Sequence, residues 1–248
     1  MIYIVGTGPG KISGMTLEAK AALDASQIIV GYKVYVDLLK ADFPDKEFAW
    51  TGMGKEIERC KLCFDYALEG KNVSLVCSGD AGVYGMAEPL FRLQKENSVY
   101  REVEITVIPG VTAALSGAAL LGAPLNHDFC VISLSDLLTP WEIIERRLRA
   151  AVQGDFALAV YNPQSHHRKD YLDKACKILI EEGAAPDRAC GFVKNIGREG
   201  QDAAFCRLSE LASQDIDMFT TVFIGNSQSD FFESDKGIKL LTKRGYKL

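Results

Sequence analysis

Four short apolar runs recur in the first half of the sequence, and segments with helical spacing separate them. The runs are Ile2–Val5, Ile28–Val30, Val73–Val76 and Ile105–Ile108. Apolar residues in the intervening segments, such as Leu17–Leu23 and Ile57–Leu68, are spaced to line one face of a helix. Regular alternation of buried strands and helices is typical of a mostly parallel α/β sheet. The first half of the chain is therefore predicted to form one such sheet.

The alternation is interrupted at residues 122–126, where the sequence reads Gly-Ala-Pro-Leu-Asn. A second series of strand-like runs follows, at Phe129–Leu134, Phe156–Val160, Cys190–Val193 and Thr221–Ile224. We therefore predict two α/β domains with mostly parallel sheets, an N-terminal domain over 1–120 and a C-terminal domain over 121–248. Turn-like residues at 234–237, with apolar residues on either side, predict a terminal hairpin.

Charge and cysteine content narrow the class of protein. The 248 residues include 28 basic and 33 acidic side chains, so the net charge of -5 provides no general attraction for nucleic acid. No signal peptide is recognised, so the seven cysteines are expected to be reduced thiols in the cytoplasm. The uncharged stretch 105–126 is broken by Pro109, by glycines and by Pro124, so no membrane span is predicted.

Three glycine-containing loops each follow a predicted strand of the first domain. They read GTGPG at 6–10, SGDAGVYG at 78–85 and PGVTA at 109–113. Loops at the carboxyl ends of parallel strands lie along one edge of a sheet, where α/β proteins bind ligands. None of the loops has the GK[ST] sequence of a P-loop, and Lys11 stands where a dinucleotide fingerprint needs glycine. We expect a flat ligand without phosphate, whose hydroxyl or amino groups suit Asp80.

Each loop also has a purely structural interpretation. A single glycine-rich turn is often only a tight connection between strand and helix. Asp80 would then cap a helix that begins near Val83, and Thr112 would cap the helix after the third loop. Under the ligand interpretation, Gly79 is expected to leave no room for a Cβ atom against the ligand. Three such loops in one domain favour a ligand site, and both interpretations stay open.

Four motifs, at 6–10, 78–80, 109–113 and 161–163, resemble the ordered motifs of the tetrapyrrole methylases. The resemblance covers the whole chain. Three longer strings, SGDAGVYGMA, NHDFCVISLSDLLTPW and YNPQSHHR, resemble one branch, the precorrin-3B C(17)-methyltransferases of cobalamin biosynthesis. The chain departs from the family's usual pattern at Ala81, where proline is common, and at Gln164, His166 and His167, where the branch is more basic.

The resemblance implies that S-adenosylmethionine binds in the cleft between the two domains. The implied contacts are Pro9, Ser78, Gly79, Asp80, Val83, Thr112 and Ala113 from the first domain and Asn162, Ile196 and Thr221 from the second. It further implies a homodimer that methylates carbon 17 of a precorrin-type tetrapyrrole by direct in-line attack, with coupled ring contraction. Ring contraction requires proton transfers, for which the candidate catalytic residues are Asp80, Tyr84 and His127. Arg168 is the candidate for binding substrate carboxylates.

Three other functions stay open: methyl transfer to a different carbon or ring system, a dinucleotide-dependent oxidoreductase, and a tetrapyrrole carrier without activity. No metal site is predicted, because His127, His166 and His167 lack the ligand spacing typical of zinc sites. Cys60 and Cys63 match the CxxC pattern of redox proteins, but their position in mid-helix favours two cysteines on a packed face.

Overall fold

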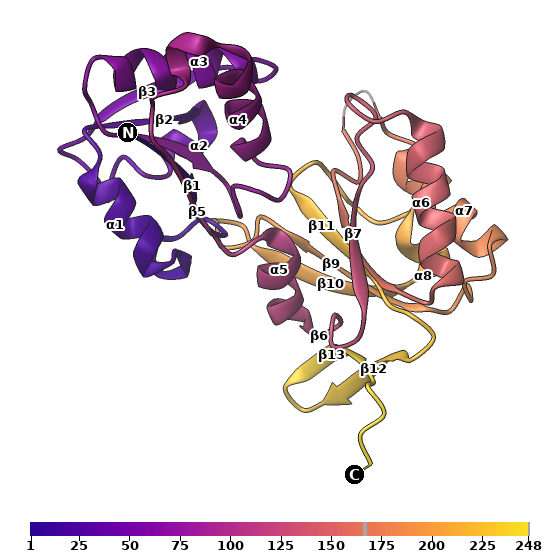
Figure 1. Cartoon of the computed structure of the whole chain (residues 1–248). Coiled ribbons are helices and arrows are strands. Elements are labelled where there is room, and N and C mark those ends of the chain that lie inside the picture. The colour runs from indigo at the N-terminus through magenta and orange to yellow at the C-terminus, as the bar shows by residue number, and fades with distance from the viewer. Residues whose placement is uncertain (166–167, 248) are drawn as a thin grey trace. The chain divides into compact units, whose positions relative to one another are not determined.

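The computed structural model describes residues 1–165 and 168–247 (Figure 1). Contacts divide the chain into two compact units, Met1–Ala113 and Ala114–Leu248. The division follows residue 113, whereas the sequence predicts a boundary after residue 120. The difference arises because helix α5 (Ala113–Leu121) packs within the second unit.

The first unit is built around a five-stranded parallel sheet. Its strands are β1 (Ile2–Gly6), β2 (Ile28–Tyr32), β3 (Glu47–Thr51), β4 (Val73–Cys77) and β5 (Ile105–Ile108), in the spatial order β3-β2-β4-β1-β5. Its helices are α1 (Leu17–Ala25), α2 (Lys33–Asp37), α3 (Glu56–Leu68) and α4 (Ala87–Glu96), with 3₁₀ turns η1 (Ile12–Gly14) and η2 (Ser98–Tyr100). All neighbouring strands run parallel, which confirms the prediction for this half.

Helices cover both faces of this sheet (Figure 1). Phe64 of α3 and Leu90 of α4 are buried in one apolar cluster with residues of one sheet face. Leu23 of α1 and Val36 of α2 are buried in a second cluster with residues of the other face. Helix α1 begins where the sequence predicts, because the Thr16 hydroxyl accepts a hydrogen bond of 3.1 Å from the backbone N–H of Ala19.

The second unit has a five-stranded mixed sheet. Its strands are β7 (Phe129–Ser133), β8 (Ala157–Tyr161), β9 (Ala189–Lys194), β10 (Asp202–Arg207) and β11 (Thr220–Ile224), in the order β10-β9-β11-β8-β7. Only β7 and β8 pair in parallel, and the other three pairs are antiparallel. The prediction of a mostly parallel sheet was therefore wrong for this unit, because a buried apolar run looks the same in either strand direction.

Two helical layers enclose the mixed sheet. Helices α6 (Trp141–Gln153), α7 (Tyr171–Glu181) and α8 (Leu208–Leu211) bury their apolar residues in one cluster with one face of the sheet. Helix α5 lies on the opposite face, where a methyl carbon placed on Gly117 would approach the Phe223 ring to 2.8 Å. Such close approach explains why α5 consists largely of alanine, glycine and serine.

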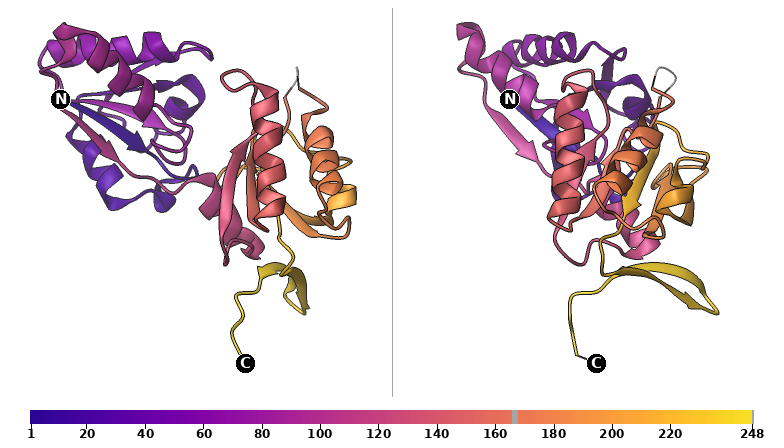
Figure 2. Two further views of the ribbon diagram at one scale, coloured as in Figure 1. Left: turned by 45° about the vertical axis from the view of Figure 1, so that its right-hand side comes forward. Right: turned by 90° about the vertical axis from the view of Figure 1, so that its right-hand side faces the viewer.

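The chain ends in the predicted hairpin. Strands β12 (Ser229–Ser234) and β13 (Gly237–Thr242) pair antiparallel, and β13 also pairs with the short β6 (Gly122–Ala123). Figure 2 shows the hairpin and the tail that follows it. Phe231 of β12 contacts Phe205 edge to face and lies beneath the Arg207 guanidinium, which fastens the hairpin to β10. Within the part of the chain that the structure describes, no helix combines the length and apolar character needed to cross a membrane.

Candidate functional site

The three glycine-containing loops of the first unit lie side by side. They follow β4, β1 and β5, which are adjacent in the sheet and end at the same edge. Gly8 and Gly79 join the first two loops, because each backbone N–H donates to the other's carbonyl, at 3.0 and 2.8 Å. Thr7 adds bonds from its N–H and its hydroxyl to the Cys77 carbonyl. The three loops thus lie at one edge of the sheet, as the sequence predicts, and hydrogen bonds join the first two.

Asp80 holds this edge together with its carboxylate. Oδ1 accepts hydrogen bonds from the N–H groups of Gly82 and Val83, at 2.8 and 3.1 Å. Oδ2 accepts a hydrogen bond of 3.0 Å from the N–H of Gly110 in the third loop. Asp80 does not cap the following helix, because α4 begins at Ala87 rather than near Val83. The carboxylate orders two loops, and this role was not among those predicted for it.

The glycines at this edge serve the contacts between loops. A methyl carbon on Gly110 would lie 2.1 Å from the Gly79 carbonyl oxygen, and one on Gly6 would lie 2.6 Å from the Gly110 nitrogen. Gly79 itself has more room, since the nearest atom to its methyl position is Thr112 Cα at 3.4 Å, but its φ is +70°. Within the described chain it is therefore the backbone conformation of Gly79 that favours glycine, and the lack of room for a Cβ atom against the ligand stays a prediction.

The remaining candidates of the first unit lie on the same loops. Pro9 follows Gly8, Ser78 directly follows β4, and Thr112 and Ala113 lie where the third loop enters α5. Tyr84 lies in the second loop, is 59% exposed and has a φ of 54°. A positive φ is uncommon for tyrosine, and such conformations gather at ligand-binding and catalytic sites.

In the second unit, three predicted cofactor residues lie at one edge of the mixed sheet. Asn162 follows the carboxyl end of β8, and Ile196 lies two residues beyond the carboxyl end of β9. Thr221 lies near the amino end of β11, which runs antiparallel to both strands, and it pairs with Val193. The strand directions therefore bring Asn162, Ile196 and Thr221 together, although 59 residues of sequence separate the first from the last.

Two of these side chains have polar atoms suited to a ligand. Thr221 is 6% exposed, and its hydroxyl forms no hydrogen bond within the described residues. Asn162 has a φ of 51°, and its Nδ2 donates to Ser133 Oγ at 2.9 Å, which fixes the amide and leaves Oδ1 as an acceptor. Ile196 is different, because its Cδ1 lies 3.0 Å from the methyl position of Gly117 and so packs against α5. The Thr221 hydroxyl and the fixed Asn162 amide acceptor fit a ligand that carries hydroxyl and amino groups.

Arg168 is held by neighbours of its own unit. Its Nη1 donates to Ser135 Oγ at 3.0 Å and lies 3.6 Å from Asp136 Oδ1, and its side chain is only 15% exposed. Tyr171 Oη donates to Asp136 Oδ2 at 2.6 Å. This hydrogen bond is the main reason why the pKa of Asp136 lies below its ordinary value, with Arg168 as a lesser cause. The guanidinium therefore orders the segment after β7 through Ser135 and Asp136.

His127 lies apart from this edge. It precedes β7 by two residues, at the amino end of that strand, whereas Asn162 follows the carboxyl end of the parallel neighbour β8. Its Nδ1 accepts a hydrogen bond from the backbone N–H of Asp128. The structure therefore does not bring His127 to the cluster of predicted residues in its unit. His166 and His167 lie outside the described residues.

Cys60 and Cys63 lie in mid-helix in α3 and are fully buried, as the packed-face interpretation predicts. Burial raises the pKa of the Cys60 thiol to about 12 and that of Cys63 well above its usual value, so neither thiol is ionised near neutral pH. This is the opposite of the low thiol pKa that redox CxxC pairs require. Across the described residues, no group of three or more His, Cys, Asp or Glu side chains is arranged to hold a metal.

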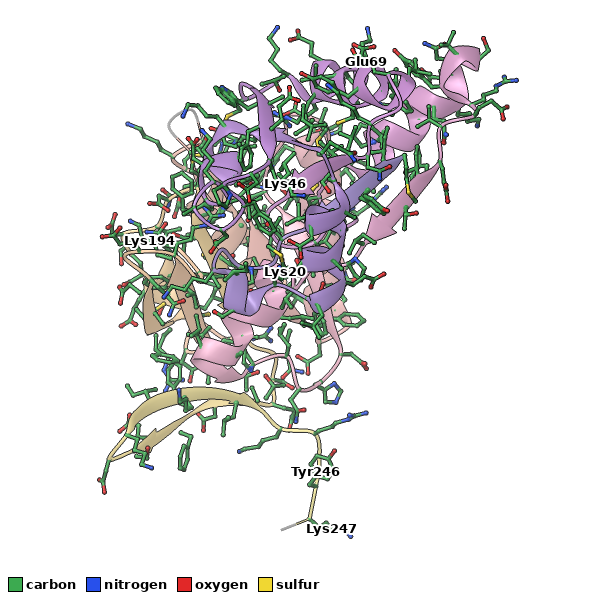
Figure 3. All side chains as sticks on the ribbon, turned by 90° about the vertical axis from the view of Figure 1, so that its left-hand side faces the viewer. Lys20, Lys46, Glu69, Lys194, Tyr246 and Lys247 are labelled. Atoms are coloured by element: carbon green, nitrogen blue, oxygen red, sulfur yellow. The ribbon has the colours of Figure 1, made fainter. Side chains whose placement is uncertain are left out.

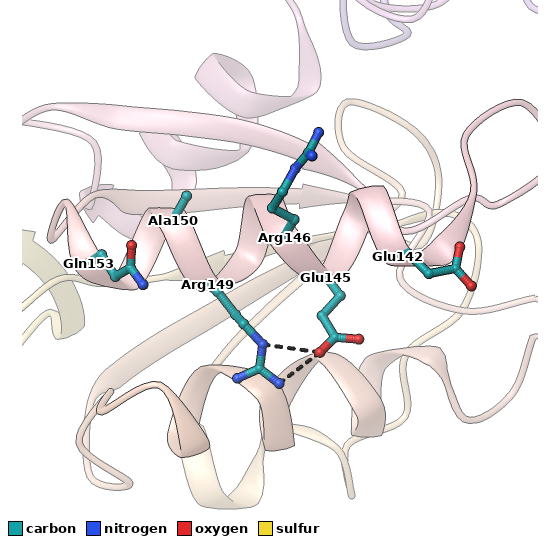
Figure 4. A pocket seen from close by; sticks show the side chains of 6 residues that line it. All are labelled: Glu142, Glu145, Arg146, Arg149, Ala150 and Gln153. Carbon is teal, nitrogen blue, oxygen red and sulfur yellow. Dashed lines mark hydrogen bonds and ion pairs between the residues drawn. The ribbon is translucent and has the colours of Figure 1, made fainter.

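A recess of about 360 Å³ lies along α6 (Figure 4). Its lining consists of Glu142, Glu145, Arg146, Arg149, Ala150 and Gln153. Arg149 donates to Glu145 at 2.7 Å and pairs with Glu182 at 3.1 Å. Ion pairs occur elsewhere on the surface too, since Lys20 pairs with Asp24 and Lys194 with Asp217. Figure 3 labels the two lysines. The recess therefore presents a balanced charged surface without a distinct ligand site.

Comparison with known proteins decides what these loops belong to. The family model of the tetrapyrrole (corrin/porphyrin) methylases matches residues 1–212. The chain belongs to the tetrapyrrole methylases. Tetrapyrrole methylases use S-adenosylmethionine as methyl donor, so the predicted enzyme class and cofactor are confirmed. The resemblance drawn from the motifs is confirmed as well.

Individual tetrapyrrole methylases match over nearly the full length. A probable cobalt-factor III C(17)-methyltransferase from Salmonella typhimurium is 44% identical over 248 residues, which is 100% of each chain. A precorrin-3B C(17)-methyltransferase from Sinorhizobium sp is 39% identical over 94% of this chain and 92% of its own. The crystal structure of the methyltransferase CobJ has a TM-score of 0.87 and 36% identity, covering 96% of this chain and 98% of CobJ. The predicted fold of the methylase family is thereby confirmed.

Proposed function

We propose that this protein transfers the methyl group of S-adenosylmethionine to carbon 17 of a precorrin-3-type tetrapyrrole, with coupled ring contraction, in cobalamin biosynthesis. The observation that carries the proposal is the 44% identity to a probable cobalt-factor III C(17)-methyltransferase over the whole of both chains. The 39% identity to a precorrin-3B C(17)-methyltransferase supports the same ring position.

S-adenosylmethionine supplies a methyl group that is already activated by its sulfonium, so the chain's own task is positioning. We assign binding of the cofactor to the loop edge of the first unit and to Asn162 and Thr221 of the second. The Thr221 hydroxyl and Asn162 Oδ1 would bind hydroxyl or amino groups, and the ordered loops would present backbone groups. Holding two reactants in line contributes at best about 7–11 kcal/mol to a reaction of this kind.

Ring contraction requires a group that transfers protons, and Tyr84 is our candidate. Asp80 is a weaker one, because its carboxylate already accepts three backbone hydrogen bonds. His127 is weaker because it lies at the opposite end of its strand from the Asn162 edge. The Tyr84 side chain is exposed on the loop that also carries Ser78 and Gly79. A tyrosine hydroxyl within reach of the substrate can act as general acid or base.

The assembly and location are proposals that rest on the family. We propose a cytoplasmic homodimer whose partner is the precorrin-type substrate, without binding of nucleic acid or membrane. The net charge of -5 supports the absence of a nucleic-acid role. Light scattering at micromolar concentration tests the dimer, and a monomeric mass would contradict it.

Methyl transfer from labelled S-adenosylmethionine to precorrin-3B and to cobalt-factor III tests the function. Label on carbon 17 of either ring, located by NMR, supports the proposal. Label at another carbon, or binding of NAD without binding of S-adenosylhomocysteine, contradicts it. Thr221→Val should weaken S-adenosylhomocysteine binding about tenfold and leave stability nearly unchanged. The matched variant Thr220→Val removes a hydroxyl bonded to Asp217, so it should lower stability and spare the affinity.

A further inference from the structure

Arg59, in the first turn of α3, is a buried arginine in the first unit. The residue is only 4% exposed. Nη2 donates to the Gly52 carbonyl at 3.0 Å, and Nη1 contacts the Met86 thioether sulfur at 3.7 Å. Nε is buried and has no hydrogen-bond partner within the described residues. The guanidinium thus has one neutral oxygen and one weak sulfur acceptor.

Two other arginines with an unpartnered buried Nε differ from Arg59 in one respect. Arg168 lies 3.6 Å from a carboxylate oxygen of Asp136, and Arg188 lies 3.7 Å from one of Asp155. Arg59 forms no ion pair with any described residue. Burying a charge without a counter-charge is costly, and buried charges in proteins are normally paired. The described residues supply no counter-charge for Arg59, so a bound anion would be its first ionic partner.

The position of Arg59 indicates where that anion would arrive. Tyr32, whose ring centre lies 6.0 Å from the guanidinium carbon, ends β2, and Gly52 follows β3. Met86 ends the loop that begins at Ser78 after β4 and carries Asp80. Arg59 therefore lies at the edge of the parallel sheet that holds the three glycine-containing loops. Ligands of α/β proteins bind at this edge.

A short, exposed segment contacts the guanidinium through the Gly52 carbonyl. Residues 52–54 read Gly-Met-Gly, all three are exposed, and Met53 is 65% exposed. A methyl carbon on Gly52 or on Gly54 would have no atom of the described chain within 4 Å. Few contacts hold such a segment in place, so it can shift at low cost to admit a ligand.

We propose that Arg59 binds a carboxylate of the tetrapyrrole substrate, and that the segment 52–54 gives way to admit it. The inference rests on the proposed function, because precorrins carry several acetate and propionate groups. A guanidinium presents two parallel N–H donors that match a carboxylate, whereas the present acceptors of Arg59 are one neutral carbonyl and one thioether sulfur. Arg59 is thus a substrate-binding residue that neither the motifs nor the charge pattern of the sequence revealed.

Arg59→Met and Arg59→Lys test the proposal, with Arg188→Met as the matched control for loss of a buried arginine. Binding of cobalt-factor III is followed by its absorbance, S-adenosylhomocysteine binding by calorimetry, and the unfolding of ligand-free protein by heating. We expect Arg59→Met to weaken cobalt-factor III binding about ten- to hundredfold, with S-adenosylhomocysteine affinity within about twofold. Arg59→Lys should restore part of the affinity because it keeps the charge.

The unfolding temperature separates binding from a structural role. Arg59→Met should melt no lower than the wild type, because it removes an unpaired buried charge, whereas Arg188→Met breaks a pair and should melt lower. Equal cobalt-factor III binding by wild type and Arg59→Met overturns the proposal, and so does a lowered melting temperature with loss of both ligands. If the wild type binds cobalt-factor III without methylating it and Arg59→Met abolishes the binding, the Arg59 proposal stands and the proposed function fails.

Discussion

The Asp80 carboxylate and the backbone N–H of Gly110 are joined by a hydrogen bond of 3.0 Å between loops that are 30 residues apart. The other carboxylate oxygen orders the turn at Gly82 and Val83. One side chain therefore fixes two of the three loops. We therefore expect Asp80 to determine the shape of the site and not to transfer protons.

Asp80→Asn should weaken both folding and cofactor binding. An amide nitrogen would replace one oxygen and could not accept from a backbone N–H, so one charge-assisted bond, worth about 1.5–3 kcal/mol, is lost. Urea unfolding and calorimetry with S-adenosylhomocysteine measure the two effects. Asp24→Asn, which breaks only the exposed pair with Lys20, should change stability by less than about 0.5 kcal/mol. If Asp80→Asn lost turnover with unchanged stability and affinity, Asp80 would instead act as a catalytic acid or base.

At Gly79, substitutions should be ranked by their tolerance of a positive φ. Because φ is +70° and the methyl position has its nearest atom at 3.4 Å, the strain lies in the backbone. Gly79→Asn should be more stable than Gly79→Val by at least about 1 kcal/mol, since asparagine adopts this conformation more readily. Urea unfolding of the two variants gives the comparison. Equal destabilisation would point to crowding as the cause.

Tyr84→Phe should separate cofactor binding from turnover. If the hydroxyl transfers a proton, its removal lowers kcat by about 10²–10⁴-fold. S-adenosylhomocysteine affinity should stay within about twofold, because the loop bonds made by Asp80 are untouched. Single-turnover kinetics with cobalt-factor III give the rate, and an unchanged rate would remove Tyr84 from the mechanism.

The buried thiols predict a loss of stability at alkaline pH. Burial raises the pKa of Cys60 to about 12 and that of Cys77 to about 11, from 9.0 in the unfolded chain. Above pH 9 the folded state therefore keeps thiol protons that the unfolded state releases. The contribution of these thiols to the free energy of unfolding is complete below pH 9 and is lost as pH rises toward 11. Urea midpoints between pH 7 and 10.5 should fall above pH 9. Cys60→Ala should flatten the slope by up to about 1.4 kcal/mol per pH unit, and an unchanged slope would contradict the assignment.

Arg168→Ala and Tyr171→Phe should have similar effects on the substrate. Both side chains bond to the segment after β7, through Ser135 and Asp136. If Arg168 acts by ordering this segment, each variant should raise the KM for the tetrapyrrole about three- to tenfold, and the double variant by less than the product. A much larger effect of Arg168→Ala alone would restore its assignment as a direct carboxylate ligand.

Elements with a local signal were predictable from the sequence. Thr16 caps α1, the apolar runs are strands, and the turn at 234–237 forms the hairpin. Strand direction in the second unit was not predictable, because it depends on which distant strands pair. The start of α4 was placed too early, because Asp80 bonds to the loop N–H groups of Gly82 and Val83 and to the third loop, and it leaves the helix uncapped.

In the candidate site, too, features with a local sequence signal were predictable and features set by distant contacts were not. Sequence motifs located the loops of the first unit, and the resemblance to the methylase family supplied the residues at the edge of the mixed sheet. Which side chain is already occupied could not be deduced, because it depends on contacts between distant segments. Arg168 has a carboxylate neighbour at 3.6 Å and Arg59 forms no ion pair among the described residues, yet nothing local in the sequence distinguishes the two arginines.

The paired hydrogen bonds between Gly8 and Gly79 have a consequence for the rate at which a ligand is captured. Loops that are already tied to one another lose little conformational entropy on contact with a ligand, and they need no ordering step before it can dock. Association of S-adenosylhomocysteine should therefore follow simple second-order kinetics, without a slow conformational phase. Differences in affinity among variants of these loops should then appear in the residence time of the ligand and not in its rate of arrival.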